Sequence, residues 1–129
     1  MSQNKVKTVF DYNGVSYEFD VRDADTSEKY ENALEKMDKE EKEMPKTGKG
    51  SEIIRAQCKM LKDFFDNCLG EGAGTAICGE KNNISVCYEA YGAFLDMIAT
   101  QKDGVLASKN TFQKYSNRQQ RRAAHKHGK

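Results

Sequence analysis

Hydrophobic and polar side chains alternate through residues 5–22, which is the period of a half-buried β-hairpin. Asn13-Gly14 lies at the centre of this segment and is a preferred pair for a two-residue type I′ turn, because both turn positions need a positive φ. Folding the chain about this turn gives one largely apolar face made of four cross-strand pairs: Tyr12–Val15, Phe10–Tyr17, Thr8–Phe19 and Val6–Val21. A lone hairpin is marginal in water, so we expect this face to pack on the rest of the protein.

Two segments with a helical period follow the hairpin. The first is predicted to span residues 26–44, with cap candidates at 25–27 and Pro45 directly after its end. Its apolar stripe is narrow and is surrounded by charged residues: Tyr30, Ala33, Leu34, Met37 and Met44. The second helix is predicted over residues 51–69, with Ser51 as its cap. Its wider apolar face is predicted to form core: Ile54, Cys58, Leu61, Phe65 and Cys68.

A glycine-rich stretch ends the second helix, and residues 73–78 can form one short turn within it. Asn83 is the predicted cap of a third helix over residues 84–101, and Gly104 fits its C-terminal stop. The apolar side of this helix is predicted to carry Cys87, Tyr91, Phe94, Leu95 and Ile98. Together these elements predict an α+β fold, in which an N-terminal β-hairpin packs on a mainly helical domain with three main helices.

Charge divides the chain into unlike parts. We place a single α+β domain at residues 1–108 and a basic tail, disordered or helical, at residues 109–129. Residues 23–44 contain nine acids and four bases, whereas residues 109–129 contain seven bases and no acid. The formal net charge is nevertheless only +1. Such asymmetry is typical of a tail that interacts with another molecule.

The cysteines and the apolar runs indicate a cytoplasmic protein. No apolar run approaches the length of a membrane span, and the N-terminal segment lacks the apolar core of a secretory signal. The four cysteines, which are Cys58, Cys68, Cys78 and Cys87, are therefore predicted to be reduced thiols. Their spacings of ten, ten and nine residues differ from the short pairs of zinc sites, so we expect buried free thiols and no metal.

No catalytic constellation is evident. Gly74–Gly79 has the glycine spacing of a phosphate-binding loop, but Glu80 stands where such a loop needs lysine. Both histidines, His125 and His127, lie in the tail and are not expected to be held against a thiol. We therefore expect no cofactor and a protein that is not an enzyme.

The tail admits three interpretations: a solvated end, a helix that folds on an acidic protein, or a nucleic-acid contact. Its candidate partner-binding residues are Arg118, Arg121, Arg122 and Lys126. No aromatic residue interleaves with the three arginines to stack on bases, which weakens the nucleic-acid interpretation.

Several short segments form a recognisable set: Tyr12-Asn13-Gly14, residues 64–72 (FFDNCLGEG), 79–83 (GEKNN), 87–91 (CYEAY) and 117–123 (NRQQRRA). This set resembles the small tail proteins of long-tailed phages and prophages of Gram-positive bacteria, and among these the tail assembly chaperones. The resemblance covers most of the chain, and its motifs are structural rather than chemical.

The resemblance implies a non-enzymatic helper in the host cytoplasm. Such a helper binds the long helical tape measure protein, keeps it soluble, and helps to recruit tail-tube protein. The resemblance also implies that a longer frameshifted form is made. The lack of a long apolar run predicts that the protein has no membrane partner. The alternative is a small structural virion protein, or a nucleic-acid-associated protein, that acts through the basic tail.

Overall fold

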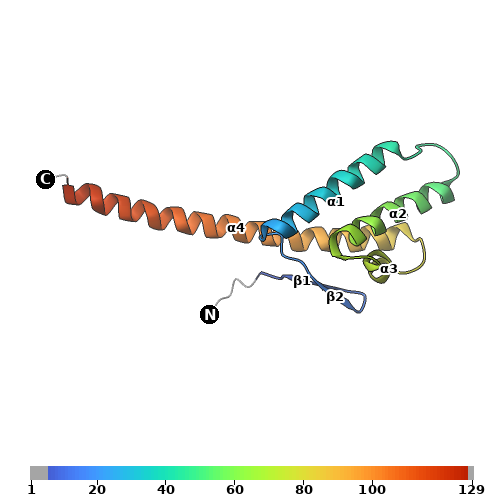
Figure 1. Ribbon diagram of the computed structural model, residues 1–129, viewed down its shortest axis with the longest axis horizontal. Helices are drawn as coiled ribbons and strands as arrows, with labels where there is room; N and C mark the ends of the chain where they lie inside the picture. The colour runs from blue at the N-terminus through green and yellow to red at the C-terminus, as the bar shows by residue number, and fades with distance from the viewer. Residues whose placement is uncertain (1–5, 128–129) are drawn as a thin grey trace.

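The computed structural model describes the backbone of residues 6–127 and the side chains of residues 6–116. Within this part of the chain two strands, β1 (Val9–Tyr12) and β2 (Val15–Glu18), precede four helices. The helices are α1 (Ala24–Glu43), α2 (Gly50–Leu69), α3 (Ala73–Cys78) and α4 (Ile84–His127). Figure 1 shows α1 and the hairpin on opposite sides of α4. The predicted α+β class, a hairpin packed on a mainly helical domain, is confirmed.

The hairpin has the predicted register. Phe10 pairs with Tyr17 and Tyr12 pairs with Val15 in an antiparallel sheet of two strands. Asn13 and Gly14 take φ values of 54° and 82°, as the type I′ turn requires. The turn is fixed to α3, because the Asn13 side-chain amide donates a hydrogen bond to the Ile77 carbonyl oxygen at 3.3 Å.

An aromatic cluster joins the hairpin to α2 and α4. Phe94 of α4 lies at its centre, with its ring centroid 5.1 Å from that of Phe10 and 5.3 Å from that of Phe19. The ring of Phe65 in α2 lies 5.4 Å from Phe94, and the ring of Phe64 lies 5.9 Å from it. All five side chains are buried. The apolar face of the hairpin is therefore covered by helices, as its pattern predicts.

The starts of two helices differ from prediction. Asp23, not a residue in 25–27, caps α1, because its carboxylate accepts a hydrogen bond from the Thr26 backbone N–H at 3.2 Å. Helix α2 begins at Gly50, one residue before the predicted cap Ser51, and no side chain caps it. Asn83 caps α4 as predicted, since its side-chain oxygen accepts from the backbone N–H of Ser85 at 3.0 Å.

The predicted core faces of α2 and α4 need correction at three positions. Ile54 is 37% exposed because α4 covers only the later part of α2, and Figure 1 shows the outer ends of α1 and α2 standing away from α4. Tyr91 and Leu95 are only half-buried. Ala90 and Met97 are buried in α4 instead, because the hairpin and α2 face its other flank.

Helix α4 does not stop near residue 101 or at Gly104 but continues to His127. Gly104 serves close packing, not helix termination: a Cβ atom there would lie 2.9 Å from the Val6 Cγ2 atom. The residues that follow include good helix formers and no proline, so nothing interrupts the hydrogen-bond ladder. Of the two alternatives for the tail, the structure has the helical one through residue 127.

We call residues 102–127 of α4 the arm. At the rise of an α-helix, this segment is about 39 Å long. Figure 1 shows it, in orange to red, projecting from the rest of the protein on the side opposite the α1–α2 connection. The arm therefore presents its surface away from the body of the molecule.

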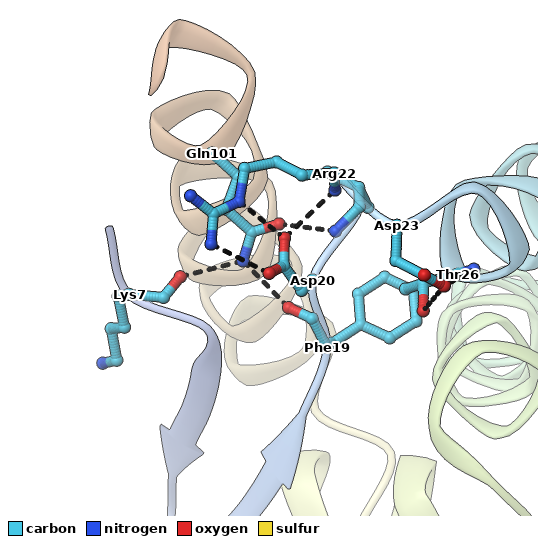
Figure 2. Close-up of polar contacts among 8 residues, drawn as sticks. Lys7, Phe19, Asp20, Arg22, Asp23, Thr26 and Gln101 are labelled. Carbon is cyan, nitrogen blue, oxygen red and sulfur yellow. Dashed lines mark hydrogen bonds and ion pairs between the residues drawn. The ribbon is translucent and has the colours of Figure 1, made fainter. Parts of the chain in front are cut away.

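Gln101, at the root of the arm, ties α4 to the outer ends of both strands. Its side chain is fully buried, and its Oε1 atom accepts a hydrogen bond from the Val21 backbone N–H at 2.8 Å. Its Nε2 atom donates to the carbonyl oxygens of Lys7 and Phe19, each at 2.8 Å. Figure 2 shows Gln101 of α4 reaching the segment before β1, at Lys7, and the segment after β2, at Phe19. One polar side chain thus satisfies three backbone groups.

Candidate protein-binding surfaces

The arm carries an exposed apolar stripe. Val105, Leu106, Phe112 and Tyr115 are 46%, 57%, 69% and 60% exposed. Val105, Phe112 and Tyr115 are spaced by seven and three residues, so they lie along one face of the helix. Large apolar side chains grouped on one exposed face are typical of an interaction site. We call Val105, Phe112 and Tyr115 the arm stripe; Leu106 is exposed on another face of the helix.

Beyond Asp103, every charged residue of the arm is basic. Lys109 and Lys114 flank the arm stripe, and the sequence from residue 104 to 129 contains no acid. The four predicted partner-binding residues belong to the same helix downstream: Arg118, Arg121, Arg122 and Lys126. Their side chains lie outside the described residues. The arm is therefore a basic helix with an apolar face, and not only a charged tail.

Sequence reasoning missed the arm stripe, although a signal for it exists. Positions 98, 101, 105, 108, 112 and 115 follow a continuous spacing of three and four residues, from the core of α4 into the arm. The glycine at 104 conceals this continuity, because glycine at that place is also typical of a helix stop.

A second surface lies between α1, α2 and α4. Here a groove of about 350 Å³ is lined by Met37 of α1, Met60 of α2 and Tyr91 of α4, with Asp38 and Glu41 of α1 among its lining residues. We call it the acidic groove. Most of its lining residues are apolar or aromatic, and its two charged lining residues are both carboxylates. Burial raises the pKa of Tyr91, with Tyr30, Cys68 and Glu41 adding to the effect, so its hydroxyl stays protonated near neutral pH.

The negative charge extends beyond the acidic groove. An adjoining pocket of about 230 Å³ is lined by three acids, Glu40, Glu43 and Asp63, and by one base, Lys59. The Lys59 ammonium lies 2.8 Å from the Asp63 carboxylate, so two of the three acids are not paired with this lysine. Helix α1 as a whole contains eight acids and four bases. The Lys42 ammonium lies 3.1 Å from the Asp38 carboxylate, but both side chains are well exposed, so the pair is easily exchanged for another partner. This side of the molecule is suited to a basic ligand.

The four cysteines are free and buried, as predicted. Burial raises the pKa of the Cys68 thiol to about 12 and that of the Cys58 thiol to about 11. It also raises the pKa of Cys78 and Cys87. Within the part of the chain whose side chains are described, no three histidine, cysteine or acidic residues are grouped to hold a metal ion. The thiols fill the core between helices.

Because the four thiols are buried, we predict that they react slowly with thiol reagents in the folded protein. We expect all four to react with an aromatic disulfide reagent at least about 100-fold more slowly in the folded protein than in denaturant, because only the exposed thiolate attacks. The measurement is the absorbance of the released aromatic thiol over time at mildly alkaline pH. The unfolded chain, in which all four cysteines are accessible, gives the reference rate and the reference amplitude. Fast labelling of any one thiol in the folded protein would contradict its burial.

Among the described residues, no helix contains an apolar stretch long enough for a bilayer crossing.

A family model described as a family of unknown function (DUF6673) matches residues 13–125, from the turn of the hairpin to near the end of the arm. No curated protein and no solved structure matches the chain.

Proposed function

We propose that this chain, which belongs to the DUF6673 family of unknown function, is a phage tail assembly chaperone that acts by binding. Its client would be the tape measure protein, which it keeps soluble in the cytoplasm of the bacterial host while helping to recruit tail-tube protein. It does so without catalysis. The observation that carries the proposal is the arm stripe on a basic helix, together with the resemblance of the sequence to tail assembly chaperones.

The arm has the properties that recognition of a long helical client requires. An amphipathic helix binds another helix by burying an apolar stripe whose residues recur every three or four positions. Phe112 and Tyr115 provide the largest such side chains, and aromatic residues contribute most to binding energy at interfaces. The basic residues around them favour an acidic segment of the client. We therefore assign client binding to the arm.

The test is co-expression of the protein with fragments of a tape measure protein. Replacing Phe112 and Tyr115 with serine is expected to weaken client binding by at least about tenfold, because both anchors of the stripe are lost. The readouts are the fraction of the fragment that stays soluble and the dissociation constant of the purified complex. Ile54→Ser with Val86→Ser is the matched control, since both residues are exposed apolar side chains outside the arm. Client solubility that is unchanged by the arm variant would overturn the assignment.

The basic residues separate this function from its alternative, a structural virion or nucleic-acid-associated protein. Changing Arg118, Arg121 and Arg122 to alanine is expected to leave the melting temperature within about two degrees, because this basic sequence offers little apolar surface to a core. In salt titrations, the chaperone function predicts that this variant loses affinity for the client. Retention of DNA that depends on these arginines, with client solubility unaffected, would favour the alternative.

A further inference from the structure

We propose that the arm of one copy binds in the acidic groove of a second copy, so that the protein associates head to tail with itself. The inference goes beyond the proposed function, because it needs no client. It joins the two surfaces described above, the arm stripe and the acidic groove, which the sequence places in one chain.

Charge is the first argument. Residues 23–44, which include the α1 part of the groove, carry nine acids and four bases, and residues 109–129 carry seven bases and no acid. Asp38 and Glu41 line the groove itself, whereas Lys109 and Lys114 flank the arm stripe. These opposite charges favour and orient the contact between an arm and a groove, whereas two grooves or two arms repel each other.

Apolar complementarity is the second argument. The apolar and aromatic lining of the groove includes Met37, Met60 and Tyr91, which are flexible or flat side chains that adapt to a ligand. The arm stripe offers Phe112 and Tyr115, the most exposed large apolar residues of the chain's described part. An apolar groove with two acidic lining residues therefore matches an apolar stripe that is flanked by basic residues.

The geometry of α4 decides which copy supplies the arm. Tyr91 and Phe112 belong to the same continuous helix and are 21 residues apart. This spacing corresponds to about 32 Å along the axis, and an α-helix without a break cannot fold back on itself. Figure 1 shows the arm projecting on the side opposite the α1–α2 connection. The groove of each molecule is thus inaccessible to its own arm.

The contact uses different surfaces on the two partners, so each copy keeps one free groove or one free arm for a further contact. Such heterologous contacts extend into open chains or close into rings. Because the arm is also the proposed client site, a client and a second copy would compete for it. This competition is the only part of the inference that rests on the proposed function.

The experiment is sedimentation of the full chain without any client. We expect the average mass of the wild-type protein to rise with concentration up to about 1 mM. The rise should be smaller at about 0.5 M salt than at about 0.05 M salt, because screening weakens the charge contacts. A groove variant, Asp38→Lys with Glu41→Lys, and an arm variant, Phe112→Asp with Tyr115→Asp, should each weaken association by at least about tenfold.

Mixing the two variants gives the sharpest outcome. The groove variant retains an arm and the arm variant retains a groove, so an equimolar mixture should form a pair that cannot grow further. Glu28→Lys with Glu31→Lys is the matched control, since it makes the same charge change on exposed residues of α1 that do not line the groove. Thermal melts of every variant check that the fold is intact.

Three results would overturn the inference. The wild type could remain monomeric at every concentration, the groove variant could associate like the wild type, or the mixture could fail to form the pair. None of these results bears on client binding, which is measured separately. A self-association that the control variant weakens as much as the groove variant would also exclude the acidic groove as the site.

Discussion

Gly74→Ala is expected to lower the free energy of unfolding by about 3 kcal/mol or more, because α3 packs on α2 without room for a side chain. A Cβ atom at residue 74 would lie 2.2 Å from the Lys62 carbonyl oxygen and 2.6 Å from the Lys62 Cα atom. These atoms belong to the backbone of α2, which cannot yield as the end of a flexible side chain can. The substitution must push the two helices apart.

The displacement would also break a hydrogen bond. The Gly74 backbone N–H donates to the Asp66 carboxylate at 2.6 Å, and this contact fixes the first turn of α3 against α2. Gly92→Ala is the matched control, since Gly92 lies inside α4 and a methyl group there would meet no neighbouring atom within 4 Å. It is expected to raise the free energy of unfolding by about 0.5–1 kcal/mol through helix propensity.

Chemical denaturation of the two variants measures both effects. The two variants are expected to change the free energy of unfolding in opposite directions. A general intolerance of alanine at glycine positions would instead destabilise both variants. A Gly74→Ala protein within about 1 kcal/mol of the wild type would show that α3 can move off α2 at little cost.

Gln101→Leu is expected to lower the free energy of unfolding by about 3 kcal/mol, although leucine fills a similar volume. The loss arises because three backbone groups lose their partner: the Val21 N–H and the carbonyl oxygens of Lys7 and Phe19. Chemical denaturation gives the magnitude, and hydrogen exchange should show faster exchange in the hairpin than in α2. Gln113→Leu is the control, because it makes the same change at an exposed position of the same helix.

A second variant identifies which hydrogen bonds matter. An ionised carboxylate in Gln101→Glu can accept from Val21 but cannot donate to the two carbonyl oxygens. Burial next to those oxygens should raise the carboxyl pKa in the folded state above its unfolded value of about 4.3. The variant should therefore be most stable near pH 4 and lose stability as the pH rises toward 8. A pH-independent deficit would mean that the donated hydrogen bonds contribute little.

The hairpin was predictable because its signals are local. The turn at Asn13-Gly14 and the period of two fix the register together, and the pairing of Phe10 with Tyr17 follows from them. The bounds of α1 and α2 follow to within two residues from the period of apolar residues and from Pro45. Local chemistry decides these elements, so one sequence is enough.

Other features depend on contacts between distant parts of the chain. Gly104 has the local signature of a helix stop, but its role is to admit Val6, almost a hundred residues earlier. Gln101 resembles a solvent-exposed polar residue at a helix end, because its partners Lys7, Phe19 and Val21 belong to the hairpin segment. The acidic groove likewise takes residues from three helices. No pattern within a single segment reveals such a site.

The unbroken course of α4 has a mechanical consequence. Phe94 is fixed in the aromatic core and Phe112 lies on the same rod, about 27 Å further along. A partner bound at Phe112 would therefore be held at a fixed distance and in a fixed orientation relative to the aromatic core, because no flexible joint interrupts the helix between them. If many copies bind along one filament, such a rigid helix would give neighbouring copies a constant spacing.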